Sequence, residues 1–154
     1  MPAKAPDAQD DPARVLIVDD EAAIRVLCRI NLRLAGFDTL EAADGDVAVS
    51  TARAERPDAI VLDVMMPGRN GWEVAEALAA DQATAGIPII FLSARTDESD
   101  RRRGLELGAL DYVRKPFDPL ELVSSIRDVL ERVNRGEAEA LRRERLAELT
   151  QEQT

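Results

Sequence analysis

Acidic, hydroxyl and ammonium side chains recur in this sequence at the ends of short apolar runs. They are Asp19, Asp20, Asp63, Ser93 and Lys115. If the runs form a parallel sheet, the residues that follow each strand gather at one edge of it. Carboxylates that lie so close repel one another unless a cation lies among them, and ligands that are all oxygen suit Mg²⁺. A carboxylate beside a metal, facing a lysine and a hydroxyl, predicts a phosphoryl site in which the carboxylate is the nucleophile.

Each of these residues also has an ordinary structural explanation. Asp19 and Asp20 could cap a helix, and Asp63 could be a turn residue ahead of the proline and glycine that follow it. Ser93 could cap the next helix, and Lys115 could be a surface lysine. All of them fall at the same predicted edge, however, so the structural explanation needs a separate coincidence at each position. The sequence therefore favours the functional interpretation.

Five apolar runs alternate with segments of helical periodicity over residues 14–133. The runs cover residues 15–18, 37–40, 59–62, 87–92 and 109–113. Three of them are almost continuously apolar, as expected for strands that are covered on both faces. Strands that alternate with helices predict a doubly wound α/β domain, a five-stranded parallel sheet with helices on both faces.

The helical segments between the runs carry recognisable start and stop signals. Gly36 stands where a left-handed cap would close the first helix, and Asp118 with Pro119 is typical of a helix start. The other predicted helices cover residues 47–54, 72–79 and 97–107. Trp72 is interpreted as a packing residue, and the arginines at 101–103 as a solvated face, with contact to a partner as the alternative.

The last segment of the chain is strongly charged and prone to form a helix. Leu141, Leu146 and Leu149 give it only a thin apolar stripe. We interpret it as a solvated helical extension, because a coiled-coil seam needs more than three leucines. The expected organisation is a disordered tail over 1–13, one domain over 14–133, and a charged helical extension or linker over 134–154.

Composition excludes several classes of protein. The 154 residues carry a formal net charge of -10, which disfavours contact with a nucleic-acid backbone or an anionic membrane. The chain contains no histidine and only one cysteine, Cys28, so it has no Ser-His-Asp triad and no internal disulfide. The first eleven residues hold no apolar stretch that could form a signal peptide or a membrane span. A cytoplasmic protein is expected.

Four short motifs, in this order, resemble those of the receiver domains of bacterial two-component response regulators. They are VLIVDDE (15–21), DVMMPG (63–68) followed by Gly71, SA (93–94) and YVRKPF (112–117). The resemblance spans residues 14–133. It implies the flavodoxin-like strand order 2-1-3-4-5. It also implies a reversible, Mg²⁺-dependent phosphorylation that signals by a change of shape.

The same resemblance implies a role for each motif residue. Asp63 matches the phosphoacceptor, and Asp20 and Asp19 match the metal ligands, with Asp19 acting through water. The backbone carbonyl of Met65 matches a further metal ligand. Lys115 matches the lysine that pairs with the phosphoryl group, and its bond to the following proline is expected to be cis.

Two further matches concern switching. Ser93 matches the hydroxyl that moves toward the phosphoryl group, and Tyr112 matches the aromatic residue that turns inward behind it. A strand aromatic with no part in switching remains the alternative for Tyr112. Met65 and Arg95 occupy positions that modulate hydrolysis of the aspartyl phosphate, and the apolar Met65 predicts slow self-dephosphorylation.

The resemblance also implies partners. The phosphoryl donor would be a sensor histidine kinase or a phosphotransfer protein, which supplies the histidine that this chain lacks. The output is either a downstream protein target of a stand-alone receiver or an effector domain beyond the linker. A homodimer that depends on phosphorylation is left open. A turnover enzyme of the haloacid-dehalogenase kind is disfavoured, because Met65 stands where those phosphatases carry a general acid.

Overall fold

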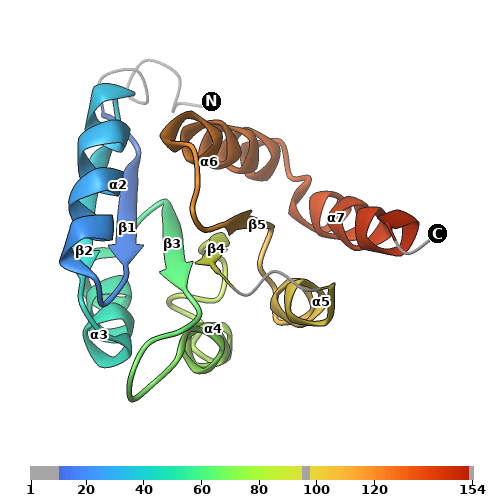
Figure 1. Ribbon diagram of the computed structural model, residues 1–154, viewed down its shortest axis with the longest axis horizontal. Helices are drawn as coiled ribbons and strands as arrows, with labels where there is room; N and C mark the ends of the chain where they lie inside the picture. The colour runs from blue at the N-terminus through green and yellow to red at the C-terminus, as the bar shows by residue number, and fades with distance from the viewer. Residues whose placement is uncertain (1–10, 95–97, 153–154) are drawn as a thin grey trace.

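The structure is a computed structural model that describes residues 11–94 and 98–152 (Figure 1). Most of the predicted N-terminal tail, together with Arg95 and the predicted helix start at Asp97, therefore lies outside the described residues. The strands are β1 (Arg14–Val18), β2 (Asp38–Ala42), β3 (Ala59–Asp63), β4 (Ile89–Ser93) and β5 (Asp111–Arg114). The helices are α2 (Ala22–Leu34), α3 (Gly45–Glu55), α4 (Gly71–Ala80), α5 (Glu98–Glu106), α6 (Pro119–Asn134) and α7 (Ala138–Glu152).

The strands form one parallel sheet in the order β2-β1-β3-β4-β5. The predicted fold class and strand order are confirmed. All residues of β3 and β4 are buried, as are four of the five in β1, which explains why these runs read as continuously apolar. The edge strands β2 and β5 are less buried, so their apolar runs are less continuous in the sequence.

Successive residues of each strand point to opposite faces of the sheet and enter two separate cores. Leu16 and Leu62 face α3 and α4 and pack with Trp72, so Trp72 is a packing residue as predicted. Ile17 and its neighbours on the other face pack with α2 and α6, in a core that also contains the buried Cys28. In the part of the chain that the structure describes, no helix is both long and apolar enough to cross a membrane.

Some predicted strand boundaries were wrong by about two residues. Phe37 lies in the turn that closes α2, where its N–H donates to the Leu32 carbonyl, and β2 instead begins at Asp38 and runs on to Ala42. Ile87 closes a turn by donating to the Thr84 carbonyl, so β4 begins later. These residues are apolar because they pack against the core rather than because they pair in the sheet. The predicted caps at Gly36 and Asp118 are confirmed.

The last segment folds into the predicted helix, α7, but the expectation that it is solvated was wrong. Leu141 is fully buried in the α2–α6 core, and Leu149 is only 3% exposed. Leu146 is half-buried. Three leucines are too few for a coiled coil, but they suffice to seat one helix on the rest of the fold.

Candidate functional site

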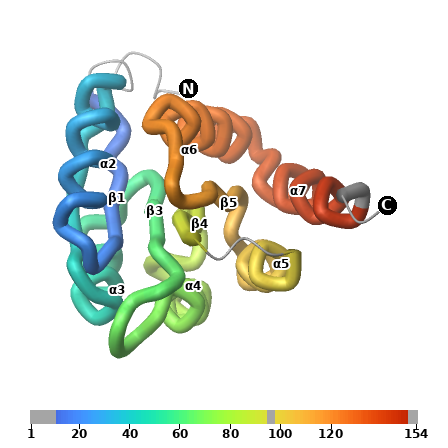
Figure 2. Tube along the Cα trace, in the orientation of Figure 1, coloured from blue at the N-terminus to red at the C-terminus, as the bar shows by residue number. Residues whose placement is uncertain are grey.

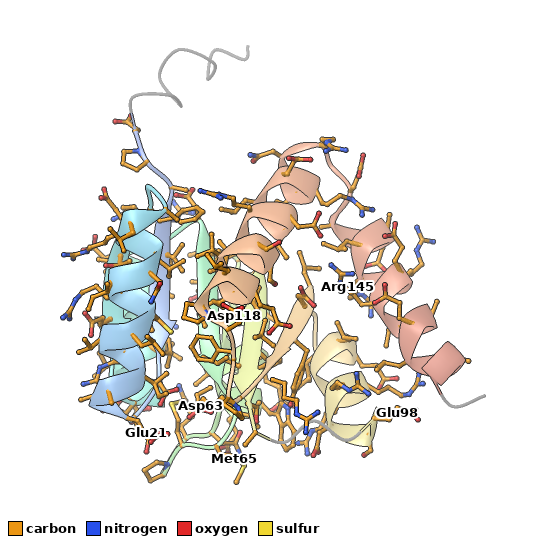
Figure 3. The ribbon with its side chains drawn as sticks, turned by 45° about the horizontal axis from the view of Figure 1, so that its top comes forward. Glu21, Asp63, Met65, Glu98, Asp118 and Arg145 are labelled. Carbon is orange, nitrogen blue, oxygen red and sulfur yellow. The ribbon has the colours of Figure 1, made fainter. Side chains whose placement is uncertain are left out.

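The predicted site residues follow neighbouring strands at the carboxyl edge of the sheet. Val18 lies opposite Leu62 in the β1–β3 pairing, which places Asp19 beside Asp63. Figure 3 shows Glu21, Asp63 and Met65 at this same end of the molecule. Asp19 and Asp63 are buried, whereas Asp20 is exposed. The edge thus combines buried carboxylates with one that faces solvent.

The Lys115 ammonium lies close to both buried carboxylates. Its Nζ lies 2.8 Å from Asp19 Oδ2 and 3.5 Å from Asp63 Oδ1. It also lies 3.7 Å from Oε1 of Glu21, an exposed residue that the sequence did not single out as a site residue. The Lys115 N–H donates to the Ser93 carbonyl at 2.9 Å, which anchors the backbone of this lysine to β4. The predicted cis bond between Lys115 and Pro116 is confirmed.

The backbone of Asp19 is held by an arginine that sequence reasoning missed. Arg25 Nη1 donates to the Asp19 carbonyl at 2.7 Å, and Arg25 Nε lies 3.4 Å from Glu41 Oε1. The Glu21 N–H donates to Asp19 Oδ1 at 2.9 Å. An arginine one turn into a helix is usually a solvated residue, so the sequence carried no signal for this contact.

Asp63 is positioned by a close approach between two backbone segments. A Cβ added to Gly71 would lie 2.3 Å from the Asp63 carbonyl oxygen and 2.8 Å from Val64 Cα. The Gly71 N–H donates to the Val64 carbonyl at 2.9 Å. The capping box between Asn70 and Glu73 begins α4 directly at this contact. Only glycine fits here, because the start of α4 lies against the acceptor strand.

Substituting Gly71 by alanine is expected to destabilise the protein by roughly 2 kcal/mol or more, because the added methyl group overlaps immobile backbone. Urea unfolding in the absence of metal measures the effect. Gly86→Ala is the matched control, because a Cβ on Gly86 meets nothing within 4 Å. Equal stability of the two variants would contradict the close approach.

Burial and neighbouring charges shift the pKa values of Asp63 and Lys115. The pKa of Asp63 is raised from 3.8 to about 6, first by burial and then by the neighbouring charge of Asp19, while Lys115 opposes both effects. Burial disfavours the charged form of Lys115, but its close contact with the Asp19 carboxylate and the charge of Asp63 outweigh that effect and raise the Lys115 pKa. One lysine thus only partly compensates the buried carboxylates, and the site favours a further cation.

The Asp63 pKa predicts a pH-dependent gain in stability when the carboxylate is removed. The folded-state pKa, about 6, lies above the ordinary 3.8, so the folded chain holds a proton that the unfolded chain releases. The stabilisation from that proton is complete below pH 3.8 and is lost as pH rises through about 6. Without metal, Asp63→Asn should therefore be more stable than wild type by about 2 kcal/mol above pH 7, with the difference vanishing near pH 4. Thermal unfolding in a chelator at both pH values measures this, and a gap independent of pH would contradict it.

The three aspartates fit a divalent cation. One carboxylate oxygen from each of Asp19, Asp20 and Asp63 can be chosen so that all lie within 4.8 Å of one another. Asp19 Oδ2 is buried, and although the Lys115 ammonium is close, the oxygen accepts no hydrogen bond of good geometry. The Met65 N–H donates to Asp63 Oδ1 at 3.3 Å, which places the Met65 backbone at the site. A hard cation with oxygen ligands such as Mg²⁺ suits this donor set.

Ser93 and Tyr112 lie at increasing distance along the sheet from these carboxylates. Ser93 ends β4, is fully buried, and follows Leu92, which lies opposite Asp63. Tyr112 lies on β5 opposite Phe91, and the two ring centroids are 5.9 Å apart. Tyr112 also lines a cavity against α5 and α7, so its ring is placed apart from the acidic cluster.

Residues 15–127 match the family model described as the response regulator receiver domain. The chain belongs to this family. A receiver domain takes part in phosphorylation-dependent signalling and is not a turnover enzyme, and members of the family generally bind Mg²⁺ in an acidic pocket. The resemblance inferred from the motifs is therefore confirmed for the domain as a whole.

Similar proteins place this receiver domain among two-component regulators. It is 45% identical over 126 residues to the phosphate regulon transcriptional regulatory protein PhoB of Pseudomonas aeruginosa, covering 82% of this chain and 55% of that protein. It is 46% identical over 128 residues to the DNA-binding response regulator MtrA of Mycobacterium tuberculosis, covering 83% and 55%. The chain spans about half the length of these curated relatives. A solved structure of chemotaxis protein CheY4 of Vibrio cholerae matches with a TM-score of 0.73 and 34% identity, covering 77% of this chain and 98% of that one.

Proposed function

We propose that this receiver accepts a phosphoryl group on Asp63 and holds Mg²⁺ with Asp19, Asp20, Asp63 and the backbone carbonyl of Met65. The observation that carries the proposal is the position of Lys115, whose ammonium lies within 3.5 Å of both buried carboxylates. A buried carboxylate beside a fixed ammonium and a cation-binding cluster has the parts that phosphoryl transfer needs.

Each residue of the site then has a chemical task. Asp63 Oδ attacks phosphorus, forming the acyl phosphate bond while the bond between phosphorus and the donor nitrogen breaks in line. Lys115 offsets charge on the phosphoryl oxygens, and the Ser93 hydroxyl donates a hydrogen bond to one of them. Bound Mg²⁺ supplies further charge neutralisation. Because the Asp63 pKa is raised to about 6 without metal, a bound cation would keep the nucleophile ionised at more acidic pH, where the metal-free carboxylate takes up a proton.

The phosphoryl donor is proposed to be a histidine on a sensor kinase or a phosphotransfer protein. The chain has no histidine of its own. Helix α2 begins directly after the acidic motif and exposes an apolar stripe on its surface. The stripe consists of Val26, Leu27, Ile30 and Leu34. A helix of the donor that packed on this stripe would lie beside the site (Figure 3).

Phosphorylation is proposed to act on α5, β5 and α6 through Ser93 and Tyr112, and from there on a protein partner, a second copy of the chain or an effector domain. The relatives are named as transcriptional and DNA-binding regulators. A net charge of -10 makes direct contact between this receiver and a phosphate backbone unfavourable. We therefore assign any control of DNA to a partner or an attached effector.

Intact-protein mass after incubation with acetyl phosphate tests the proposal. With Mg²⁺ we expect one added phosphoryl group, and with a chelator none. An adduct that forms equally well in chelator would contradict the role of the metal cluster. No adduct, combined with no binding of beryllofluoride, would contradict the proposed function as a whole.

Slow self-dephosphorylation remains a prediction, and Met65 carries it. Its side chain is 52% exposed beside Asp63, and a thioether neither donates a hydrogen bond nor accepts a strong one. Met65→Asn should shorten the phosphoryl lifetime by about tenfold, because an amide can orient an attacking water. Decay of the adduct mass with time measures this. A wild-type lifetime of only seconds with Mg²⁺ present would show that Met65 does not slow hydrolysis.

A further inference from the structure

Helix α7 lies across one face of the receiver rather than beyond it. It follows α6 after a turn at Gly136 and passes beside α5 (Figure 1). Figure 2 shows the same course of the chain, with α7 and α5 next to each other on the β5 side of the sheet. We call the surface formed by α5, β5 and α6 the α5–β5–α6 face. Through Leu149, α7 buries part of this face.

Charged contacts fix α7 on this face. Arg145 is 24% exposed, and its Nε lies 3.4 Å from Asp111 Oδ1 while its Nη2 donates to Asp128 Oδ2 at 3.1 Å. Asp111 begins β5, next to Tyr112, and its Oδ2 accepts from the Ser125 hydroxyl of α6. Figure 3 shows Arg145 on α7, reaching toward the sheet. A single α7 side chain therefore contacts both β5 and α6.

Two further arginines, Arg132 and Arg142, hold the first half of α7 and the residue before it. Arg132 of α6 donates two hydrogen bonds to the carboxylate of Glu144, at 3.0 and 2.7 Å, and one to Glu137 at 2.6 Å. Arg142 Nη1 donates to the Leu105 carbonyl of α5 at 3.3 Å. The helix is thus tied to α6 near its start, and its second half depends on Arg145 and Leu149.

The second half of α7 rests on an incompletely filled cavity that is lined in part by Tyr112, the proposed switch residue. The cavity has a volume of about 100 Å³ and lies between α5, β5 and α7. Its lining is Arg101, Leu105, Asp111, Tyr112, Arg145, Glu148 and Leu149. Under α5 the packing is close, because a Cβ on Gly104 would lie 2.8 Å from the Phe91 ring and 3.3 Å from the Tyr112 ring. A movement of Tyr112 therefore alters the support beneath both α5 and α7.

We propose that α7 is a displaceable cover of the α5–β5–α6 face, seated on the unphosphorylated receiver and released when Asp63 is phosphorylated. The inference rests on the proposed function, because the signal it reports is the phosphoryl group. The direction follows from the cavity. Tyr112, Arg145 and Leu149 line the same cavity, so an inward turn of the Tyr112 ring, which the resemblance implies, would enlarge the void under α7 and let its polar lining admit water. Helix α7 loses packing, and the face becomes available to a partner.

Thermodynamic linkage gives the proposal a second consequence. If phosphorylation weakens the seating of α7, then weakening that seating must favour the phosphorylated form by the same factor. Arg145→Ala combined with Leu149→Ala should therefore raise the affinity for beryllofluoride with Mg²⁺ by roughly fivefold or more. The matched control is Arg143→Ala, which alters an exposed α7 side chain and leaves the seated face intact.

Hydrogen exchange of the α7 backbone amides, with and without beryllofluoride and Mg²⁺, tests the proposal, with fluorine-19 resonance reporting binding. In the wild-type chain we expect binding to speed exchange at residues 146–150 on the order of tenfold. The double variant should show the faster exchange before beryllofluoride is added, and the control should behave as wild type.

The outcomes separate two kinds of failure. If beryllofluoride binds and hydrogen exchange in α7 is unchanged or slower, the release of α7 is contradicted and the proposed function stands. Absence of any bound fluorine signal overturns the proposed function and the cover together. Loss of protection from hydrogen exchange throughout the sheet would show that the double variant does not fold. The comparison of wild type with and without beryllofluoride then tests the proposal by itself.

Discussion

Replacing Asp63 by asparagine is expected to abolish the phosphoryl adduct, a loss on the order of a thousandfold or more in rate, because an amide is a poor nucleophile. The substitution keeps the size of the side chain, so the close contact between β3 and Gly71 is preserved. The same variant should be more stable than wild type without metal at neutral pH, since it removes a carboxylate whose pKa is raised to about 6, chiefly by burial. Loss of phosphorylation with gain of stability separates a chemical defect from a folding defect.

Asp38→Asn is the matched control for this variant. Asp38 begins β2, is exposed, and lies at the opposite end of the parallel sheet from the acidic cluster. The control should accept a phosphoryl group from acetyl phosphate at the wild-type rate. If Asp63→Asn retained a substantial Mg²⁺-dependent adduct, another carboxylate of the cluster would be the acceptor.

Replacing Lys115 by methionine is expected to slow phosphorylation by acetyl phosphate about 100-fold, because a fixed positive charge no longer meets the charge on the transferring group. Methionine keeps most of the apolar stem and removes the ammonium. The Asp63 pKa should then rise further above about 6, since Lys115 is the nearby charge that lowers it. The rate should therefore fall more steeply at acidic pH in the variant than in wild type. The rate of adduct formation, followed by intact mass across pH, measures both effects.

Arg114→Gln is the control for the lysine, because Arg114 is the preceding residue and is exposed. It removes one positive charge from the same strand end without altering the contacts to Asp19 and Asp63. A rate within about twofold of wild type is expected for the control. A similar rate for Lys115→Met would contradict the electrostatic role of the lysine.

The site was predictable to the extent that strand ends determine it. Asp19 and Asp63 follow continuously apolar runs, which only strands buried on both faces require, and the carboxyl ends of such strands share one edge. The cluster of Asp19, Asp20 and Asp63 therefore could be foreseen from periodicity and residue type. The contact that fixes Asp19 through Arg25 could not, because its geometry depends on how α2 packs on the sheet.

The packing of α7 against the domain also could not be predicted from the sequence. Leu141 and Leu149 are eight residues apart on a helix whose other residues are mainly charged. This pattern is as typical of a helix surrounded by solvent as of one that packs on a domain. The position of α7 depends on charges that the rest of the fold presents to it. Asp111 and Asp128 face Arg145, and Arg132 faces Glu144. These pairs join residues that are between 12 and 34 positions apart in the chain, so no local rule connects them.

Borohydride trapping followed by peptide mapping tests the central claim most directly. Borohydride reduces an aspartyl phosphate to homoserine, so it marks the acceptor covalently. After acetyl phosphate and Mg²⁺, we predict homoserine at position 63 and at no other aspartate, and none when a chelator replaces the metal. Homoserine at Asp19 or Asp20, or at none of the aspartates despite a phosphoryl adduct, would contradict the assignment of Asp63 as the phosphoacceptor.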